Sequence, residues 1–269
     1  MSLAKATRFL SLLGTHPSEF VDGAVDRVDV ALQRYRPRSP SPRVALPEVL
    51  GGVGAALGTD VEGYLSDAAL SEVEREVRDG LVALDRRPFP ASYNADSTLA
   101  RLCYALVRAT RPRTVLETGV AYGITSAFIA AALEANGEGT LHSVDRPPVE
   151  PGAERYVGIL LPPRLRHRRE LHRGSSKRVL PGLVDRLGQV DLFVHDSLHT
   201  YRNIRRELST VTPRLAPGAA VVADDATNLA FSDWAAEAAP AYWSNVADSG
   251  CAVAVLSVSG ETGAPPRSR

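Results

Sequence analysis

The sequence predicts an α/β fold with a doubly wound, mostly parallel sheet, and three observations lead to this prediction. From Asp96 onward, short apolar segments alternate regularly with segments of helical periodicity, which is the pattern of βαβ units. Each apolar segment ends in a polar residue, and ligands of open α/β sheets bind at that carboxyl edge. The first segment, VLETGVAYGITS (115–126), turns into an alanine-rich helix through two glycines. The segments are predicted to end at Glu117, Asp145, His172, Asp196 and Asp224.

Residues 1–95 differ from the rest of the chain and are predicted to form a distinct helical region. Stretches rich in proline, glycine and serine interrupt them, and residues 34–43 (RYRPRSPSPR) are predicted to be a linker. One clear helix lies in this region, and Ser71 with Glu74 fits a capping box at its start. Its apolar stripe consists of Leu70, Val73, Val77, Leu81 and Leu84. We interpret the region as a cap, a lid or a dimerisation arm over residues 96–260.

Local signals also set the helices on either side of the first strand. Asp96 or Ser97 can cap the helix before it. The helix after the glycine loop is expected over 125–135 and to end at Asn136 and Gly137, residues that readily adopt the left-handed conformation.

The C-terminal part of residues 96–260 is predicted to change the direction of the sheet. Strands are expected near 243–247 and 251–258, on either side of a turn. They would form a hairpin that adds an antiparallel strand to the sheet. Residues 261–269 are predicted to be a disordered tail.

The charge balance and the lack of long apolar runs exclude several classes of partner. Thirty-one Lys and Arg residues balance thirty-one Asp and Glu residues, so no global field draws the chain to nucleic acid or to a membrane. No apolar run reaches the length of about eighteen residues of a membrane-spanning helix, and no secretion signal is recognisable. We therefore expect a cytoplasmic protein without a membrane partner. The basic stretch 164–174 (RLRHRRELHRG) indicates either a contact with phosphate or a solvated face, and the second interpretation is favoured.

The glycine loop has the features of a ligand site. Gly119 lets the backbone turn sharply off the strand, and Gly123 lets the helix and a ligand approach closely. Glu117 would repel a pyrophosphate but suits a cationic ligand. Asp145 ends the next strand, where a doubly wound fold binds a ribose through its hydroxyls. The spacing therefore suggests a nucleoside ligand, with an ordinary tight turn as the alternative.

These residues resemble class I S-adenosylmethionine-dependent methyltransferases, whose sheet is Rossmann-like. In that family the loop wraps the methionine part of the cofactor, and the acid after the second strand binds the ribose. The resemblance implies an S-adenosylmethionine-binding methyltransferase domain over residues 96–260. Ser175 stands where the family holds the adenine edge, with helix capping as the alternative, and Tyr122 either lines the site or packs in the core. The residues assigned to the cofactor are Glu117, Gly119, Tyr122, Gly123, Thr125, Ser126, Asp145, Ser175 and Asp196.

A second group of acids ends the fourth and fifth strands. The segment VDLFVHDSLHTY reaches Asp196, and AAVVADDATN reaches Asp224 and Asp225. Carboxylates from neighbouring strand ends repel each other unless a cation lies among them. Oxygen ligands suit Mg²⁺, or Mn²⁺ and Ca²⁺, better than zinc. The alternative is that these acids cap helices or face water.

This arrangement resembles the metal-dependent O-methyltransferases, both the catechol-type enzymes and the sugar and macrolide enzymes of natural-product pathways. The resemblance implies that Asp196, Asp224 and Asp225 are the metal ligands. His199 lies where the catechol-type enzymes carry a lysine base, and an imidazole titrates near neutrality, as a general base requires. Asp196 is the alternative base. A zinc site on His195 and His199 is disfavoured, because His195 is expected within the strand.

The sequence thus predicts an S-adenosylmethionine-dependent, divalent-metal-assisted O-methyltransferase. Its acceptor would be a hydroxyl group of a small molecule, a natural-product or sugar intermediate. Two other functions stay open: a metal-independent methyltransferase acting on nucleic acid, and a cofactor-binding scaffold without catalysis. The sequence identifies neither the acceptor nor the oligomeric state, and a homo-oligomer built through residues 1–95 is compatible with it.

Overall fold

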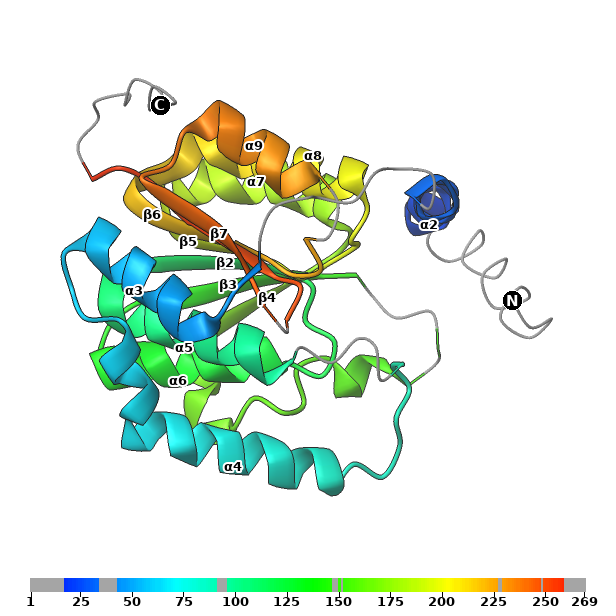
Figure 1. Cartoon of the computed structure of the whole chain (residues 1–269). Helices are drawn as coiled ribbons and strands as arrows, with labels where there is room; N and C mark the ends of the chain where they lie inside the picture. Colours follow the sequence, from blue (N-terminus) through cyan, green and yellow to red (C-terminus); the bar gives the residue numbers. More distant parts are fainter. Residues whose placement is uncertain are drawn as a thin grey trace.

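The computed structural model describes residues 17–33, 43–90, 96–146, 150, 152–226, 229–247 and 249–258. Among these residues, eight strands form one sheet with helices on both of its faces (Figure 1). The strands are β1 (Arg43–Val44), β2 (Thr114–Thr118), β3 (Thr140–Asp145), β4 (Arg169–Arg173), β5 (Val190–His195), β6 (Leu215–Ala223), β7 (Tyr242–Val246) and β8 (Ala252–Val255). Their order across the sheet is β1-β7-β8-β6-β5-β2-β3-β4.

The sheet is doubly wound around β2. The chain passes from β2 outward to β3 and β4, all parallel, and then returns to the other side of β2 with β5 and β6. β8 pairs antiparallel with both β6 and β7, so the predicted C-terminal hairpin is present. These observations confirm the predicted Rossmann-like α/β fold. The strand order reverses between β2 and β5, and ligands of such sheets bind beyond the carboxyl ends of the strands at that point.

The helices form two layers with a separate apolar cluster on each face of the sheet. One layer contains α3 (Leu46–Leu57), α5 (Ser97–Thr110) and α6 (Ile124–Asn136), and α4 (Ala68–Val82) packs on the outer side of α6. The other layer contains α7 (Ser176–Leu187), α8 (Tyr201–Val211) and α9 (Ala230–Ala238). Short 3-10 helices lie at Glu62–Ser66, Glu154–Tyr156, Pro163–Arg168 and Thr212–Arg214.

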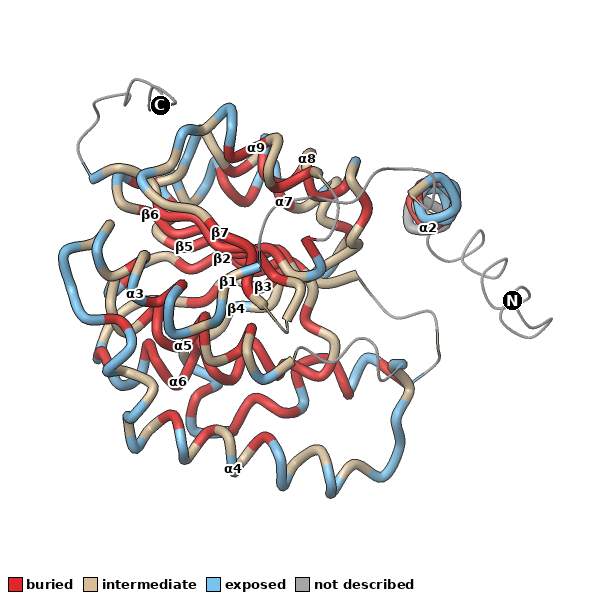
Figure 2. The backbone as a smooth tube through the Cα atoms, viewed as in Figure 1, coloured by how far each residue is buried: buried red, intermediate tan, exposed pale blue. Residues whose placement is uncertain are grey.

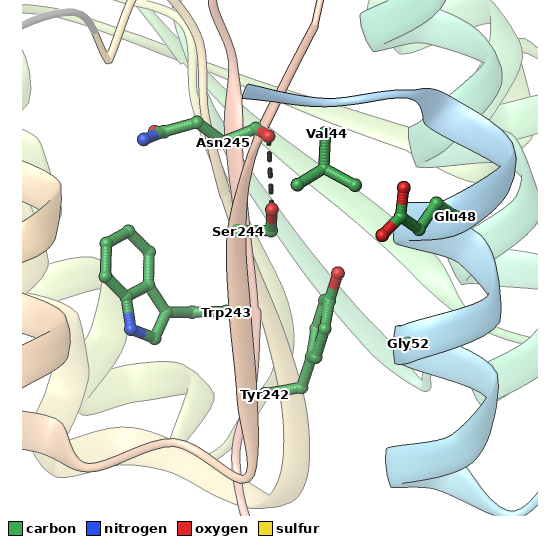
Figure 3. A pocket seen from close by; sticks show the side chains of 7 residues that line it. All are labelled: Val44, Glu48, Gly52, Tyr242, Trp243, Ser244 and Asn245. Atoms are coloured by element: carbon green, nitrogen blue, oxygen red, sulfur yellow. Dashed lines mark hydrogen bonds between the residues drawn. The ribbon is translucent and has the colours of Figure 1, made fainter. Parts of the chain in front are cut away.

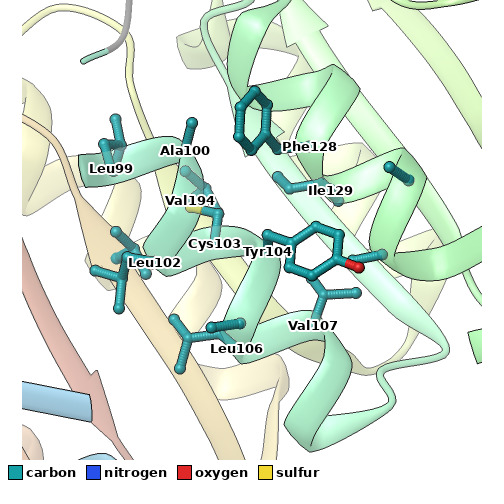
Figure 4. Close-up of a cluster of buried hydrophobic side chains, with 14 of the residues drawn as sticks. Leu99, Ala100, Leu102, Cys103, Tyr104, Leu106, Val107, Phe128, Ile129 and Val194 are labelled. Atoms are coloured by element: carbon teal, nitrogen blue, oxygen red, sulfur yellow. The ribbon is translucent and has the colours of Figure 1, made fainter. Parts of the chain in front are cut away.

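Buried residues run through the sheet and line the helix faces turned toward it (Figure 2). Figure 4 shows the side chains of α5 packed against Phe128 and Ile129 of α6 and Val194 of β5. Cys103 belongs to this cluster, and both Cys103 and Cys251 are buried free thiols.

Local signals set several element boundaries as predicted. Asp96 caps α5, because its carboxylate accepts a hydrogen bond of 2.8 Å from the amide of Leu99. α6 ends at Gly137, which has the left-handed conformation with φ of 76°. The strands also end close to the predicted acids, so the ends of β2, β3, β5 and β6 all bring polar residues to one edge.

The predicted capping box at Ser71 and Glu74 is wrong. α4 begins earlier, at Ala68, with Asp67 as its N-cap residue. The side chain of Asp67 does not cap the helix but accepts a hydrogen bond of 3.0 Å from the hydroxyl of Tyr104, so a tertiary contact decides this boundary. The predicted stripe does face the core, since Leu70, Val73 and Val77 are buried.

Residues 43–82 pack into the core of the sheet domain, whereas α2 (Pro17–Gln33) has a different environment. α3 contributes Val49, Leu50 and Val53 to the same cluster as α5 and α6, and β1 pairs with β7. α2 instead exposes much of its apolar surface. Most of the predicted linker (34–42) and the predicted tail (261–269) lie outside the described residues. None of the helices in the described parts of the chain has both the length and the apolar character needed to cross a membrane.

Candidate active site

The glycine loop between β2 and α6 lies directly against the end of β5. Gly119 has φ of 85°, and a Cβ at this position would lie 1.9 Å from the backbone oxygen of Asp196. The amide of Asp196 in turn donates a hydrogen bond of 2.8 Å to the oxygen of Thr118. Gly123 also has φ of 85°, and its Cβ would lie 2.7 Å from Cα of Gly158. Both glycines are therefore required by backbone conformation and by close approach.

Glu117 lies beneath this loop and is fully buried. Its Oε2 accepts hydrogen bonds from the hydroxyls of Ser126 (2.6 Å) and Ser143 (2.7 Å). Burial raises the pKa of Glu117 to about 7, although these hydrogen bonds oppose the rise. Among the described residues, neither Oε1 of Glu117 nor the buried hydroxyl of Thr125 has a hydrogen-bonding partner. Two buried polar groups at the loop are thus left for a ligand or water, as a polar cofactor requires.

Asp145 ends β3 on the other side of the loop. Burial raises its pKa to about 6, against the opposing effects of the Arg173 charge and of hydrogen bonds from the backbone of Val120 and Arg146. The contact with Val120 places this carboxylate at the glycine loop, where a ribose could be held through its hydroxyls.

Tyr122 and Ser175 are engaged by segments from the N-terminal region. Tyr122 is buried, packs against Phe89 with ring centroids 4.9 Å apart, and donates a hydrogen bond of 3.1 Å to the oxygen of Phe89. Ser175 occupies the N-cap position of α7, but its hydroxyl donates to Asp22 of α2 (2.6 Å) and makes no capping bond. Both predicted cofactor residues therefore have contacts with the first 95 residues.

The predicted metal and base residues come together at the ends of β5 and β6. Nε2 of His199 lies 3.6 Å from a carboxylate oxygen of Asp196 and 3.8 Å from one of Asp224. One ligand atom from each of these three residues lies within 4.8 Å of the others. Asp225, with φ of 43°, lies on the other side of the ring, 3.7 Å from Nδ1. The sequence predicted the acids as metal ligands and His199 as the base, and the structure brings the imidazole of His199 among these carboxylates.

The charges within this cluster shift the pKa values of His199 and Asp224. Burial lowers the pKa of His199, but the hydrogen bond and charge of Asp196, together with Asp224 and Asp225, raise it overall. Burial and the charge of Asp196 raise the pKa of Asp224 to about 7. Carboxylates and an imidazole that face one another in this way fit a divalent cation such as Mg²⁺ or Mn²⁺.

His195 does not join His199 in a zinc site. Its ring is buried, and Nδ1 lies 2.7 Å from Oε2 of Glu207 on α8. The rings of His195 and His199 are inclined by 68° with centroids 5.8 Å apart. The structure thus gives His195 an internal partner.

Glu207 is a buried acid beside the predicted site, and it is not among the residues predicted from the sequence. It is fully buried and accepts hydrogen bonds from Thr118 (2.6 Å), Ser197 (2.9 Å) and Asn203 (3.2 Å) as well as contacting His195. Burial alone would raise its pKa, but the charge and hydrogen bond of His195 and the hydrogen bonds of Ser176 and Thr118 lower it to about 2. The sequence signal was an acid among the buried, mainly apolar residues of α8. Glu207 joins the end of β2 to the loop after β5.

The basic stretch 164–174 is paired in part with acids of the helices packed beside it. Arg164 contacts Glu76 (2.8 Å) and Glu72 (3.2 Å), and Arg168 contacts Glu134 (2.7 Å). These acids neutralise much of the stretch, which weakens the case for a nucleic-acid surface.

A hollow of about 550 Å³ between α3 and β7 lies away from these residues (Figure 3). Its lining residues are Val44, Glu48, Gly52, Tyr242, Trp243, Ser244 and Asn245, none of which belongs to the predicted site. It lies by β1 and β7 at the end of the strand order, not at the reversal between β2 and β5, so we do not assign it to the cofactor.

Comparison with known proteins agrees with this geometry. Residues 116–226 match a family model described as a methyltransferase domain, whereas no curated protein matches the chain. A putative caffeoyl-CoA O-methyltransferase from Staphylococcus aureus superposes with a TM-score of 0.51 at 14% identity, over 73% of this chain and 96% of that chain. Cofactor-bound Rv0187 from MTB gives 0.50 at 17% identity, over 80% and 99%. At these identities the likeness establishes the fold.

The part of the chain that matches the methyltransferase domain model, residues 116–226, runs from within β2 to just beyond β6. It contains the glycine loop at the reversal of strand order and the cluster at the ends of β5 and β6.

Proposed function

We propose that the chain is a divalent-metal-assisted O-methyltransferase that acts on a hydroxyl group of a small molecule, a natural-product or sugar intermediate. One observation carries the proposal: the cofactor loop and the acid cluster are in direct contact, since a Cβ on Gly119 would collide with the backbone of Asp196. The methyl donor and the acceptor hydroxyl would therefore meet at the ends of β2 and β5.

The cofactor would be held by the loop, Glu117, Thr125 and Asp145. When bound, S-adenosylmethionine supplies the methyl group as an electrophilic carbon on a sulfonium centre. The buried carboxylate of Glu117 and the half-buried carboxylate of Asp145 favour a cationic ligand, and Asp145 can accept hydrogen bonds from ribose hydroxyls. Orientation of donor and acceptor and exclusion of water are the main tasks of the protein in such a displacement.

Asp196 and Asp224 would hold the metal, with Asp225 as the third predicted ligand. When bound, a divalent ion lowers the pKa of an acceptor hydroxyl and orients it. His199 would accept the hydroxyl proton, and Asp225, 3.7 Å from Nδ1, would orient the imidazole ring. Asp196 lies close enough to His199 to serve as the alternative base.

α2 would act as a lid over the cofactor site. Two of its acids contact residues that follow β3 and β4: Asp22 bonds to Ser175 and Arg178, and Asp26 bonds to Lys177 (2.6 Å) and Arg146 (2.8 Å). Asp22 is therefore bonded to the residue predicted to hold the adenine edge. With α2 in place, a bound cofactor would leave only after these bonds break.

The test is formation of S-adenosylhomocysteine from S-adenosylmethionine with a panel of catechols and hydroxylated sugars. We expect that EDTA abolishes the activity and that Mg²⁺ or Mn²⁺ restores it. The variants Asp196→Asn and Asp224→Asn should be inactive but should still bind the cofactor. His199→Gln should lower kcat by about 10²- to 10⁴-fold, the usual contribution of a general base. Asp185→Asn, an exposed acid paired with Arg214, is the matched control. Normal turnover by Asp196→Asn in EDTA would refute the metal-assisted mechanism.

A further inference from the structure

A second group of metal-ligating side chains lies on the opposite side of the cofactor loop from β5, at the free edge of the sheet. In the parallel pair β3–β4, His142 lies opposite Glu170, and Val144 lies opposite His172. Side chains two residues apart on a strand share a face, so all three polar residues lie on the same face as Val144. Val144 packs in the apolar cluster that contains residues of α7. The three side chains therefore stand together beside α7.

The distances among these side chains fit a tetrahedral metal site. Nδ1 of His142 lies 3.3 Å from Nε2 of His172 and 3.4 Å from Oε2 of Glu170. One ligand atom from each of the three residues lies within 4.8 Å of the others. Ligand atoms about 2.0–2.1 Å from a tetrahedral Zn²⁺ are about 3.4 Å apart, so two of the three separations already match a bound ion.

Burial favours the neutral form of both imidazoles. Burial lowers the pKa of His142 and of His172, and the nearby charge of Glu170 offsets this only in part. A neutral imidazole offers a lone pair to a cation, whereas a protonated one does not. The side chain of His142 is only 12% exposed and that of Glu170 is 62% exposed, so an ion could enter from the edge of the sheet.

The geometry points to a transition-metal site of the Zn²⁺ class formed by His142, Glu170 and His172, with a fourth position open to water. Two imidazoles and one carboxylate favour Zn²⁺ over Mg²⁺, whereas the Asp196 cluster contains mainly carboxylates and favours Mg²⁺ or Mn²⁺. The two sites share no residue. An internal N–H···N hydrogen bond between the two histidines is the competing explanation of the 3.3 Å contact.

The test is a Zn²⁺ titration in competition with a chromophoric chelator. Because Zn²⁺ could also bind near Asp196, the titration uses full-length protein carrying Asp224→Asn and His199→Gln. We expect one equivalent of Zn²⁺. Loss of an outer-shell partner typically weakens metal affinity by about 10- to 100-fold, so loss of the ligand in His172→Gln should weaken it by at least about tenfold.

His167→Gln is the matched control, because His167 is an exposed histidine just before β4 that pairs with Glu134 (3.1 Å). It should leave Zn²⁺ affinity unchanged. Glu170→Gln gives a second test at a position whose side chain is 62% exposed. Zn²⁺ should also raise the Tm of the parent protein more than that of His172→Gln or Glu170→Gln. Unchanged Zn²⁺ affinity in both His172→Gln and Glu170→Gln, or no bound equivalent in the parent, would overturn the site.

Discussion

At the scale of single residues, two buried glutamates with opposite protonation preferences lie beneath the proposed active site. Burial raises the pKa of Glu117 to about 7, whereas the charge of His195 and several hydrogen bonds overcome burial and lower the pKa of Glu207 to about 2. Glu117 fixes the start of α6 through Ser126, and Glu207 joins β2 to the loop after β5 through Thr118 and Ser197. Each glutamate should therefore affect stability with its own pH dependence.

Glu207→Gln should destabilise the protein at pH 7 by on the order of 3 kcal/mol, because it removes one partner of a buried charged network. The folded-state pKa lies below the usual value of 4.5, so the stabilisation is complete above about pH 4.5 and is lost as the pH falls toward 2. Urea unfolding at pH 7 and pH 3 measures both effects, and the difference between wild type and variant should shrink at pH 3. Glu237→Gln, which removes an exposed pair with Arg205, should cost less than about 1 kcal/mol. Equal effects of the two substitutions at pH 7 would contradict the assigned role of Glu207.

Glu117→Gln should have the opposite pH dependence. Its folded-state pKa is raised from 4.5 to about 7, so the folded protein binds the proton more tightly than the unfolded chain does. In wild type, this group favours folding at low pH, and its contribution declines by up to about 3 kcal/mol as the pH rises from 4.5 to 7. The glutamine variant should lack that decline in unfolding free energy, measured without cofactor. Identical pH profiles for variant and wild type would show that Glu117 is not the group responsible.

At the scale of elements, the contact between the β2–α6 loop and the end of β5 determines the site. Gly119→Ala should abolish S-adenosylhomocysteine binding, because the new Cβ would meet the Asp196 backbone at 1.9 Å and the residue would need φ of 85°. Isothermal titration calorimetry measures the binding. Gly51→Ala is the control, since a Cβ there meets nothing within 4 Å. Retained wild-type affinity in Gly119→Ala would mean that the loop is not the cofactor site.

The lid assigned to α2 depends on charged contacts and should respond to their removal. Asp22→Asn with Asp26→Asn should speed dissociation of S-adenosylhomocysteine in stopped-flow measurements, because the bonds to Ser175, Arg178, Lys177 and Arg146 weaken. Added salt should speed dissociation from wild type in the same direction. Asp79→Asn, at an exposed acid of α4, is the control. Dissociation rates equal to those of wild type would remove the argument for a lid.

The elements that were predictable from sequence are those specified by neighbouring residues. Apolar runs that end in Glu117, Asp145, Asp196 and Asp224 predicted four of the parallel strands. Asn136 and Gly137 predicted the end of α6. The contacts of Asp22 with Ser175, 153 residues apart, left no local pattern, and neither did the role of Glu207 beneath Thr118. The predicted start of α4 was wrong for the same reason, since the side chain of the actual N-cap residue, Asp67, bonds to Tyr104, which is distant in the sequence.

At the scale of the whole molecule, one sheet edge brings together residues from widely separated parts of the chain. The reversal of strand order between β2 and β5 places the glycine loop beside Asp196, and the neighbouring β6 adds Asp224. The same fold pairs Arg164 and Arg168 of the basic stretch with acids of α4 and α6, which reduces the positive charge available to a nucleic acid. The architecture therefore favours a small acceptor at the edge where the cofactor loop and the acid cluster meet.

The most direct test of this account is Mn²⁺ binding measured by electron paramagnetic resonance, with calorimetry of S-adenosylmethionine on the same samples. We expect one Mn²⁺ bound by wild type and by His172→Gln, loss of that ion in Asp224→Asn, and unchanged cofactor affinity in both variants. Undiminished Mn²⁺ binding in Asp224→Asn, or no Mn²⁺ bound by wild type, would contradict the claim that the ends of β5 and β6 form a metal site beside the cofactor.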